Sequence, residues 1–175
     1  MGGYVAFEML RRARDRVRGL VLMDTRSEAD TPELRRARDA SAAQAREGGS
    51  AAIATAMLPK MLAAGVAAEN PALVDRVRRM MEATPVAGIL GAITALRDRP
   101  DSTPLLAPLG DIPTLVVVGE EDQITPREGA QQMADAIPGS RLAVVPGAGH
   151  LTPMERPEAA TALLADFLTS LGRPG

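Results

Sequence analysis

Residues 113–126 have the sequence PTLVVVGEEDQITP, and residues 141–151 have the sequence RLAVVPGAGHL. Each contains a run of aliphatic residues, rich in valine, that is followed at once by glycine and polar residues. Continuous apolar runs of this length, bounded by turn residues, are typical of strands buried on both faces of a parallel sheet. A third run of this kind, Leu20 to Met23, lies between Gly19 and Asp24. The sequence therefore predicts three buried strands.

Three segments that alternate with these strands have apolar residues at helical spacing: residues 1–16, 127–137 and 155–171. The last is expected to be an amphipathic helix, with Phe167 and Leu168 on its inner side. Strands that alternate with helices predict an α/β fold whose sheet is parallel and whose crossovers are right-handed.

The segment from Asp30 to about Arg99 has no strand pattern. Four short helices are expected there, opened in turn by Thr31, Ser50, Asn70 and Thr84. Gly65 is expected to close the second of them. An all-helical segment between two strands indicates an inserted lid. We therefore expect residues 1–28 and 105–175 to form a partial α/β core, and residues 29–104 to form a helical cap.

The composition argues against several classes of function. The net charge of −2 gives no basic surface for nucleic acid, and the three aromatic residues offer no stacking platform for bases. With no cysteine and one histidine, a disulfide framework and a dedicated metal site are not expected. Neither a signal peptide nor an apolar run of about 20 residues is visible, so the cytoplasm is the expected location and no membrane is expected as a partner.

Two polar residues follow neighbouring predicted strands at the edge where parallel sheets bind their ligands, namely Asp122 and His150. An imidazole shuttles protons at neutral pH, and a neighbouring carboxylate fixes its tautomer and stabilises its charged form. Taken singly, such an Asp is usually a turn or helix cap, and such a His is usually packed or solvated. Their order on successive strand ends favours a catalytic pair.

The sequence here resembles the α/β-hydrolase family. The pattern G-x-x-D-x-x-x-P at residues 119–126 is similar to the loop that carries the family's triad acid. The pattern G-x-G-H at residues 147–150, followed by Pro157-Glu158, is similar to its histidine loop. Asp24 follows a strand that is similar to the one after the family's nucleophile helix. The resemblance implies that Asp122 orients His150 and that His150 acts as general base and acid.

The same resemblance places the family's nucleophile in a G-x-S-x-G turn ahead of the acid and the histidine. Met1-Gly2-Gly3 is similar to the residues after the serine in a G-x-S-M-G-G version of that turn, so the sequence is expected to be a C-terminal portion that begins one residue after the nucleophile. Met1 and Gly2 are then the remnant of the turn and of its oxyanion donor. Ser27 is the nearest candidate for a substitute nucleophile, although a role as a loop or helix-cap residue is favoured for it. Alternatively, His150 activates water directly.

The resemblance implies a hydrolase of carboxylic esters or lactones, with no cofactor and no metal. The rival hypothesis is a catalytically impaired, truncated hydrolase that acts as a binding or oligomerising module. In a truncated sheet the edge of residues 20–23 would be uncovered, and an apolar edge strand with unpaired backbone groups pairs readily. A homodimer through this edge is therefore expected, rather than a missing half supplied by another chain.

Overall fold

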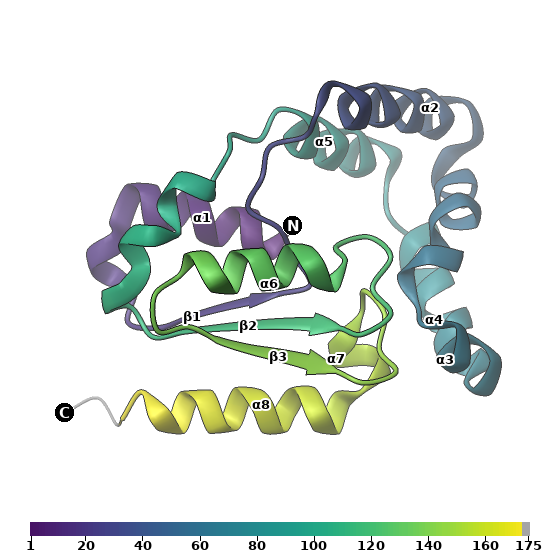
Figure 1. Cartoon of the computed structure of the whole chain (residues 1–175). Helices are drawn as coiled ribbons and strands as arrows, with labels where there is room; N and C mark the ends of the chain where they lie inside the picture. Colours follow the sequence, from purple (N-terminus) through teal and green to yellow (C-terminus); the bar gives the residue numbers. More distant parts are fainter. Residues whose placement is uncertain (173–175) are drawn as a thin grey trace.

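The computed structural model describes residues 1–172 and has a three-stranded sheet at its centre (Figure 1). The strands are β1 (Leu20–Met23), β2 (Thr114–Gly119) and β3 (Arg141–Val145), and they lie in the order β1-β2-β3. Both pairs are parallel, with Leu22 opposite Val116 and Val117 opposite Ala143. The predicted α/β fold with about three parallel strands is confirmed.

Helices cover both faces of the sheet, and successive residues of β2 point to opposite faces. Val116 and Val118 pack with Phe7 of α1 (Gly2–Ala13) and Met133 of α6 (Arg127–Ala136). On the other face, Leu115 and Val117 pack with Phe167 of α8 (Pro157–Ser170). Figure 1 shows α1 and α6 on one side of the strands and α8 on the other. All six residues of β2 are buried, as expected for the central strand of a layered α/β core.

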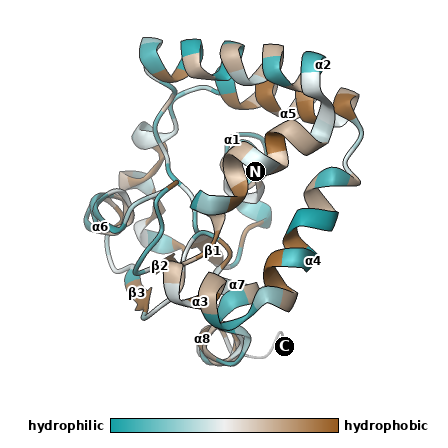
Figure 2. Cartoon of the chain, turned by 90° about the vertical axis from the view of Figure 1, so that its right-hand side faces the viewer, coloured by the Kyte–Doolittle hydropathy of each residue, from teal (hydrophilic) through white to brown (hydrophobic). Residues whose placement is uncertain are grey.

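Four helices occupy the connection between β1 and β2 and lie apart from the sheet (Figures 1 and 2). They are α2 (Pro32–Met61), α3 (Ala64–Glu69), α4 (Pro71–Glu82) and α5 (Val86–Arg97). The side chains of Thr31 and Asn70 accept hydrogen bonds from backbone N–H groups of the first turns of α2 and α4, as their residue types predict. An apolar cluster that includes Leu58, Leu62 and Val77 holds the far part of this segment together.

Two details of this segment differ from the prediction. The helices expected to start at Thr31 and Ser50 form one element, which is kinked at Gly49, where φ is 68°. Glycine adopts this left-handed conformation without the steric cost that a Cβ brings. Gly65 does not close a helix but lies inside α3, which the sequence pattern did not predict because only Val66 of its six residues is buried. A single buried apolar residue gives no repeating helical pattern that could be detected in the sequence.

The final helix is present but begins at Pro157 instead of Glu155. A short helix α7 (Thr152–Glu155) ends at Arg156, whose φ and ψ are −135° and 65°, and α8 starts at Pro157. The residue before a proline is disfavoured in the α region, so the break follows from Pro157. Phe167 is buried as expected, but Leu168 points outward and is 63% exposed, since α8 buries only a narrow strip against the sheet.

The structure also contains three short 3-10 turns: η1 (Arg14–Arg16), η2 (Thr103–Leu105) and η3 (Ala107–Asp111). Among the helices of residues 1–172, none combines the length and the apolar character that crossing a bilayer requires.

Candidate active site

The Asp122 side chain is fixed in the loop that follows β2. One carboxylate oxygen, Oδ1, accepts hydrogen bonds from the backbone N–H groups of Ile124 (2.8 Å) and Thr125 (2.9 Å). The other oxygen, Oδ2, accepts one from the Thr125 hydroxyl at 2.7 Å. The side chain is fully buried, with no exposed surface. The loop therefore holds this carboxylate rigidly at the carboxyl end of the sheet.

The loop that follows β3 brings His150 to the same point. His150 Nδ1 lies 2.9 Å from Asp122 Oδ2 and 3.3 Å from the Thr125 hydroxyl. The imidazole is 20% exposed, so one edge is engaged with the buried carboxylate while part of the ring reaches open space. The structure thus brings together the two residues that the sequence singled out, which are 28 positions apart.

Burial raises the pKa of Asp122, but the hydrogen bonds from His150 and Thr125 outweigh it and hold that pKa below its usual value. The carboxylate is therefore ionised at neutral pH. An ionised, fully hydrogen-bonded carboxylate at Nδ1 favours the neutral tautomer that carries its proton on Nδ1, which leaves Nε2 free to accept a proton.

The two loops can approach this closely because residue 119 has no side chain. A Cβ at Gly119 would lie 2.1 Å from the carbonyl oxygen of Gly149 and 2.5 Å from that of Ala148. Both neighbours are backbone atoms of the histidine loop, so they could not yield without moving His150. The glycine that opens the G-x-x-D pattern is thus explained by packing against the second loop.

A second carboxylate, Asp24, lies beside this pair and was not predicted as a site residue. It follows β1 with φ at 47°, and its carboxylate accepts hydrogen bonds from Gly119 N–H (3.2 Å), Thr152 N–H (3.2 Å) and the Thr152 hydroxyl (2.9 Å). Burial, together with the negative charge of Asp122, raises the pKa of Asp24 to about 6, although the Thr152 hydrogen bond opposes the rise. Asp24 therefore ties the end of β1 to the end of β2 and to the start of the short helix at Thr152. The sequence signal was its place directly after a buried strand.

A third buried carboxylate, Glu155, holds the backbone around His150. Its Oε1 accepts hydrogen bonds from the N–H groups of Gly149 (2.9 Å) and Leu151 (3.0 Å), the residues on either side of His150. Its Oε2 accepts one from Ala63 N–H at 2.7 Å, and His150 N–H donates to the Met61 carbonyl at 3.0 Å. The histidine loop is thus anchored both to α7 and to the end of α2. No sequence pattern pointed to Glu155, because its partner Ala63 lies 92 positions away.

His150 opens onto a cavity of about 340 Å³ between the sheet and helices α2 and α5. The cavity is lined by apolar and polar side chains in similar numbers: Met1, Tyr4, Asp24, Arg26, Leu34, Ala37, Arg38, Ser41, Met57, Met61, Leu96, Ile124, Thr125 and His150. Concave, mainly apolar sites with a few convergent polar groups are typical of small-molecule binding. We call this space the His150 cavity.

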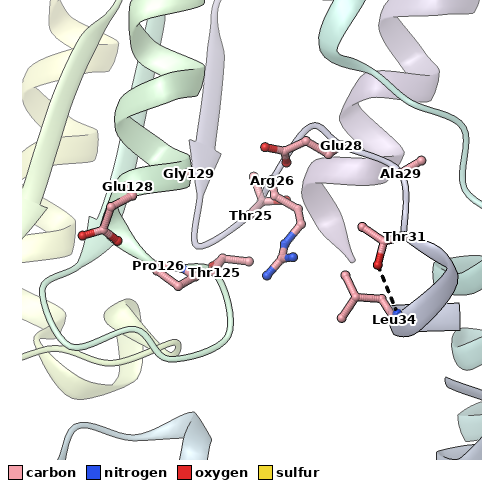
Figure 3. A pocket seen from close by; sticks show the side chains of 10 residues that line it. All are labelled: Thr25, Arg26, Glu28, Ala29, Thr31, Leu34, Thr125, Pro126, Glu128 and Gly129. Atoms are coloured by element: carbon pink, nitrogen blue, oxygen red, sulfur yellow. Dashed lines mark hydrogen bonds between the residues drawn. The ribbon is translucent and has the colours of Figure 1, made fainter. Parts of the chain in front are cut away.

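A second cavity of about 380 Å³ lies next to it, between the start of α2 and the loop of Thr125 (Figure 3). Arg26, Leu34 and Thr125 line both cavities. We call this second space the side cavity.

The other predicted site residues lie at different places. Met1 lines the His150 cavity, and Gly2 is the exposed first residue of α1. Burial and the nearby charge of Arg99 lower the pKa of the Met1 amine. Ser27 is not brought to His150: it is 4% exposed, its hydroxyl lies 3.3 Å from that of Thr103, and it does not line the His150 cavity. Its contacts are those of the loop role that the sequence favoured.

Within residues 1–172, no three side chains of the metal-binding types are grouped to hold an ion.

Comparison with known proteins agrees with this geometry. Residues 1–157 match the model of the family described as alpha/beta hydrolase fold. A thermophilic esterase from Thermogutta terrifontis, solved with malate bound, superposes with a TM-score of 0.93 at 40% sequence identity, covering 98% of this chain and 63% of that one. The enol-lactonase of Burkholderia xenovorans LB400 superposes with a TM-score of 0.85 at 30% identity, covering 97% of this chain and 63% of that one.

Among curated proteins, monoacylglycerol lipase ABHD6 of Rattus norvegicus is 36% identical over 63 residues, which are 36% of this chain and 19% of that protein. This chain thus spans about a fifth of that curated relative and about two thirds of the similar solved structures. The family match extends from α1 through the Asp122 and His150 loops, and the chain belongs to the alpha/beta hydrolase fold family.

Proposed function

We propose that this chain carries the acid and the base of a hydrolase that acts on carboxylic esters or lactones. In this proposal Asp122 orients the imidazole of His150, and His150 is the general base and acid. The observation that carries the proposal is the 2.9 Å contact between Asp122 Oδ2 and His150 Nδ1 at the wall of the His150 cavity. The esterase and the lactonase that superpose on the chain support the substrate class.

The arrangement fits proton transfer through Nε2. Nδ1 faces Asp122 and the Thr125 hydroxyl, so Nε2 is the nitrogen left to take a proton from a nucleophile. The imidazolium that forms is stabilised by the buried Asp122 carboxylate, which is already ionised and needs no rearrangement. The same proton is then available to the leaving alcohol.

We assign the nucleophile by the side of the imidazole that it must approach, and not by a residue that lies beside His150. Within residues 1–172 the hydroxyl hydrogen-bonded to His150 is that of Thr125, which is on the Nδ1 side and donates to Asp122. We therefore assign the nucleophile to a group that approaches Nε2 from the Met1 side of the His150 cavity, where the family resemblance places its serine. Direct activation of water by His150 is the weaker alternative, because general-base catalysis alone contributes only about 10²–10⁴-fold.

We also propose that two parts of the chain have different roles. Residues 1–28 and 105–175 form the partial core that positions the acid and the base, and residues 29–104 form a cap. The cap assignment is supported by Leu34, Met57 and Leu96, which line the His150 cavity opposite the sheet.

The test is hydrolysis of a short-chain p-nitrophenyl ester by the purified chain, with His150→Ala beside it. Turnover by the wild type that the variant lacks supports the proposal. Equal rates for the two proteins, whether zero or a trace, contradict catalysis by this chain on its own, including direct activation of water by His150. Circular dichroism of both proteins excludes unfolding as the cause of a lost activity.

A second candidate function is supported by one surface. Within the described residues β1 has a strand neighbour on one side only, and Met1, Val5 and Met9 of α1 are 56%, 66% and 46% exposed. A free strand edge beside exposed apolar residues is a surface that associates readily. We therefore propose, as the rival function, a binding module that forms a homodimer through β1. Light scattering at micromolar concentration tests it: a mass of twice the monomer supports the dimer, and a monomer excludes it.

A further inference from the structure

One charge at the candidate active site takes no part in the proposed proton transfer. Arg26 follows β1 two residues after Asp24, and its side chain lines both the His150 cavity and the side cavity. Its guanidinium donates a hydrogen bond to the backbone carbonyl of Ile124, in the Asp122 loop. This bond fixes the direction of the side chain while most of its N–H groups stay without a protein acceptor in the described structure.

The charge of Arg26 is not neutralised by a neighbouring carboxylate. Within residues 1–172 it forms no ion pair with an N···O distance of 4.0 Å or less. The other arginine that lines the His150 cavity, Arg38, is paired with the buried Asp30 at 3.0 Å. Asp24 is engaged by Gly119 and Thr152. Arg26 is therefore the guanidinium of these cavities that has no ion-pair partner within residues 1–172, although the carboxylates of Asp24, Glu28 and Glu128 line the same cavities.

Figure 3 shows how this guanidinium is directed. It lies between Thr125 on one side and Leu34 on the other, and the carboxylates of Glu28 and Glu128 lie away from it. Apolar side chains, Leu34 and Ile124 among them, form part of the walls around it. In a site with such walls an anion held by a guanidinium is screened less than in open water.

We propose that Arg26 is an anion-binding residue of the candidate active site, and that it selects substrates that carry a free carboxylate beside the ester or lactone group. The planar fork of its N–H donors matches a carboxylate. The substrate class is then half-esters of short dicarboxylic acids, or lactones that bear a carboxylate. The claim that the bound anion is a substrate rests on the proposed hydrolase function, whereas anion binding at Arg26 does not depend on catalysis.

The experiment is a chemical-shift titration of the purified chain with succinate and, separately, with succinamide, which has the same size and no charge. Ionic strength is held constant with sodium chloride, because surface charges are screened by salt. Arg26→Gln removes the charge, and Arg26→Lys keeps it without the fork. Arg35→Gln is the matched control, because Arg35 is exposed on α2 and lines neither cavity.

We expect succinate to bind the wild type at least about tenfold more tightly than succinamide, with shifts at the Arg26 Nε–H and the His150 ring. Arg26→Gln should abolish this preference, Arg26→Lys should keep part of it, and Arg35→Gln should leave it unchanged. Equal binding of the two ligands by the wild type, or an equal loss in Arg26→Gln and Arg35→Gln, overturns the inference.

The outcome is separable from that of the hydrolase proposal. Succinate binding that needs Arg26, in a chain that does not hydrolyse p-nitrophenyl esters, leaves the anion site standing and removes the catalytic role. Hydrolysis that needs His150, with no preference between succinate and succinamide, leaves the catalytic role and removes the anion site.

Discussion

The Glu155 carboxylate fixes the backbone on both sides of His150: one of its oxygens accepts hydrogen bonds from the N–H groups of Gly149 and Leu151, which flank the histidine. The imidazole itself is held separately, by Asp122. The backbone and the ring of the proposed base are therefore fixed by two different carboxylates. Each can be removed alone, so that the stability of the loop and the orientation of the ring are measured independently.

Glu155→Ala should lower the free energy of unfolding by about 3 kcal/mol, because it leaves the N–H groups of Gly149, Leu151 and Ala63 without their acceptor. Glu155→Gln should cost less, since its amide oxygen still accepts on one side. Urea unfolding measures both. Glu158→Ala is the control, because Glu158 is exposed in the first turn of α8, and it should change the free energy by less than about 0.5 kcal/mol. An Ala variant as stable as this control would contradict the role of Glu155.

Asp122→Asn should change the tautomer of His150 without unfolding the chain. With the carboxylate present, the proton of the neutral ring is expected on Nδ1. Because His150 is the only histidine, a two-bond nitrogen–proton spectrum reports on it without assignment. Asp122→Asn should shift the population toward the Nε2–H form, and Asp15→Asn, an exposed control, should leave it unchanged. A wild-type ring already in the Nε2–H form would show that the pair does not act as proposed.

Asp24 should make stability depend on pH. Its pKa is about 6 in the folded protein against an ordinary value of 3.8, so the folded protein holds this proton more tightly than the unfolded chain does. The contribution is complete below pH 3.8 and is lost as the pH rises through about 6. The loss amounts to roughly 2 kcal/mol by neutral pH, after allowance for partial exposure.

Asp24→Asn, which does not titrate, should lack this loss. The unfolding free energy of the wild type, relative to the variant, should therefore fall by roughly 2 kcal/mol between about pH 4 and pH 7. The lowered pKa of Asp122 acts in the opposite sense and at lower pH, so it does not obscure the window. Urea unfolding at several pH values across this window makes the comparison, and parallel curves for the two proteins would falsify the raised pKa.

Gly119→Ala should destabilise the chain by about 2–4 kcal/mol, because the new Cβ meets two backbone carbonyl oxygens of the histidine loop. Gly91→Ala is the opposite case: it lies inside α5, where a Cβ would meet no neighbouring side chain within 4 Å, and it should stabilise the chain by about 0.5–1 kcal/mol. Thermal unfolding followed by circular dichroism ranks the two variants and the wild type. The same sign of change for both would refute the role of packing at Gly119.

The strands and the acid–histidine pair were predictable because their signals are local. Runs such as Leu115 to Val118 are long enough to identify buried strands, and the carboxyl ends of adjacent parallel strands meet at one edge, so Asp122 and His150 had to approach one another. The break at Arg156 is also local, because Arg156 precedes Pro157, and it moves the start of the final helix from the predicted Glu155 to Pro157.

The supporting residues were not predictable, because their partners lie far away along the chain. Asp24 and Thr152 are 128 positions apart, and Glu155 and Ala63 are 92 apart. A single sequence contains no period or spacing that links such pairs. The same reason applies to Ser27, whose contact with Thr103 is fixed only when the two ends of the helical connection return to the sheet.

The bonds from Met61 and Ala63 to the histidine loop have a mechanical consequence. The carbonyl of Met61 and the N–H of Ala63 are both engaged by that loop, through His150 N–H and Glu155. A displacement of this end of α2 away from the sheet would break both hydrogen bonds and disturb the backbone on either side of His150. The opposite end of α2, where Leu34 lines both cavities, can shift without breaking these two bonds.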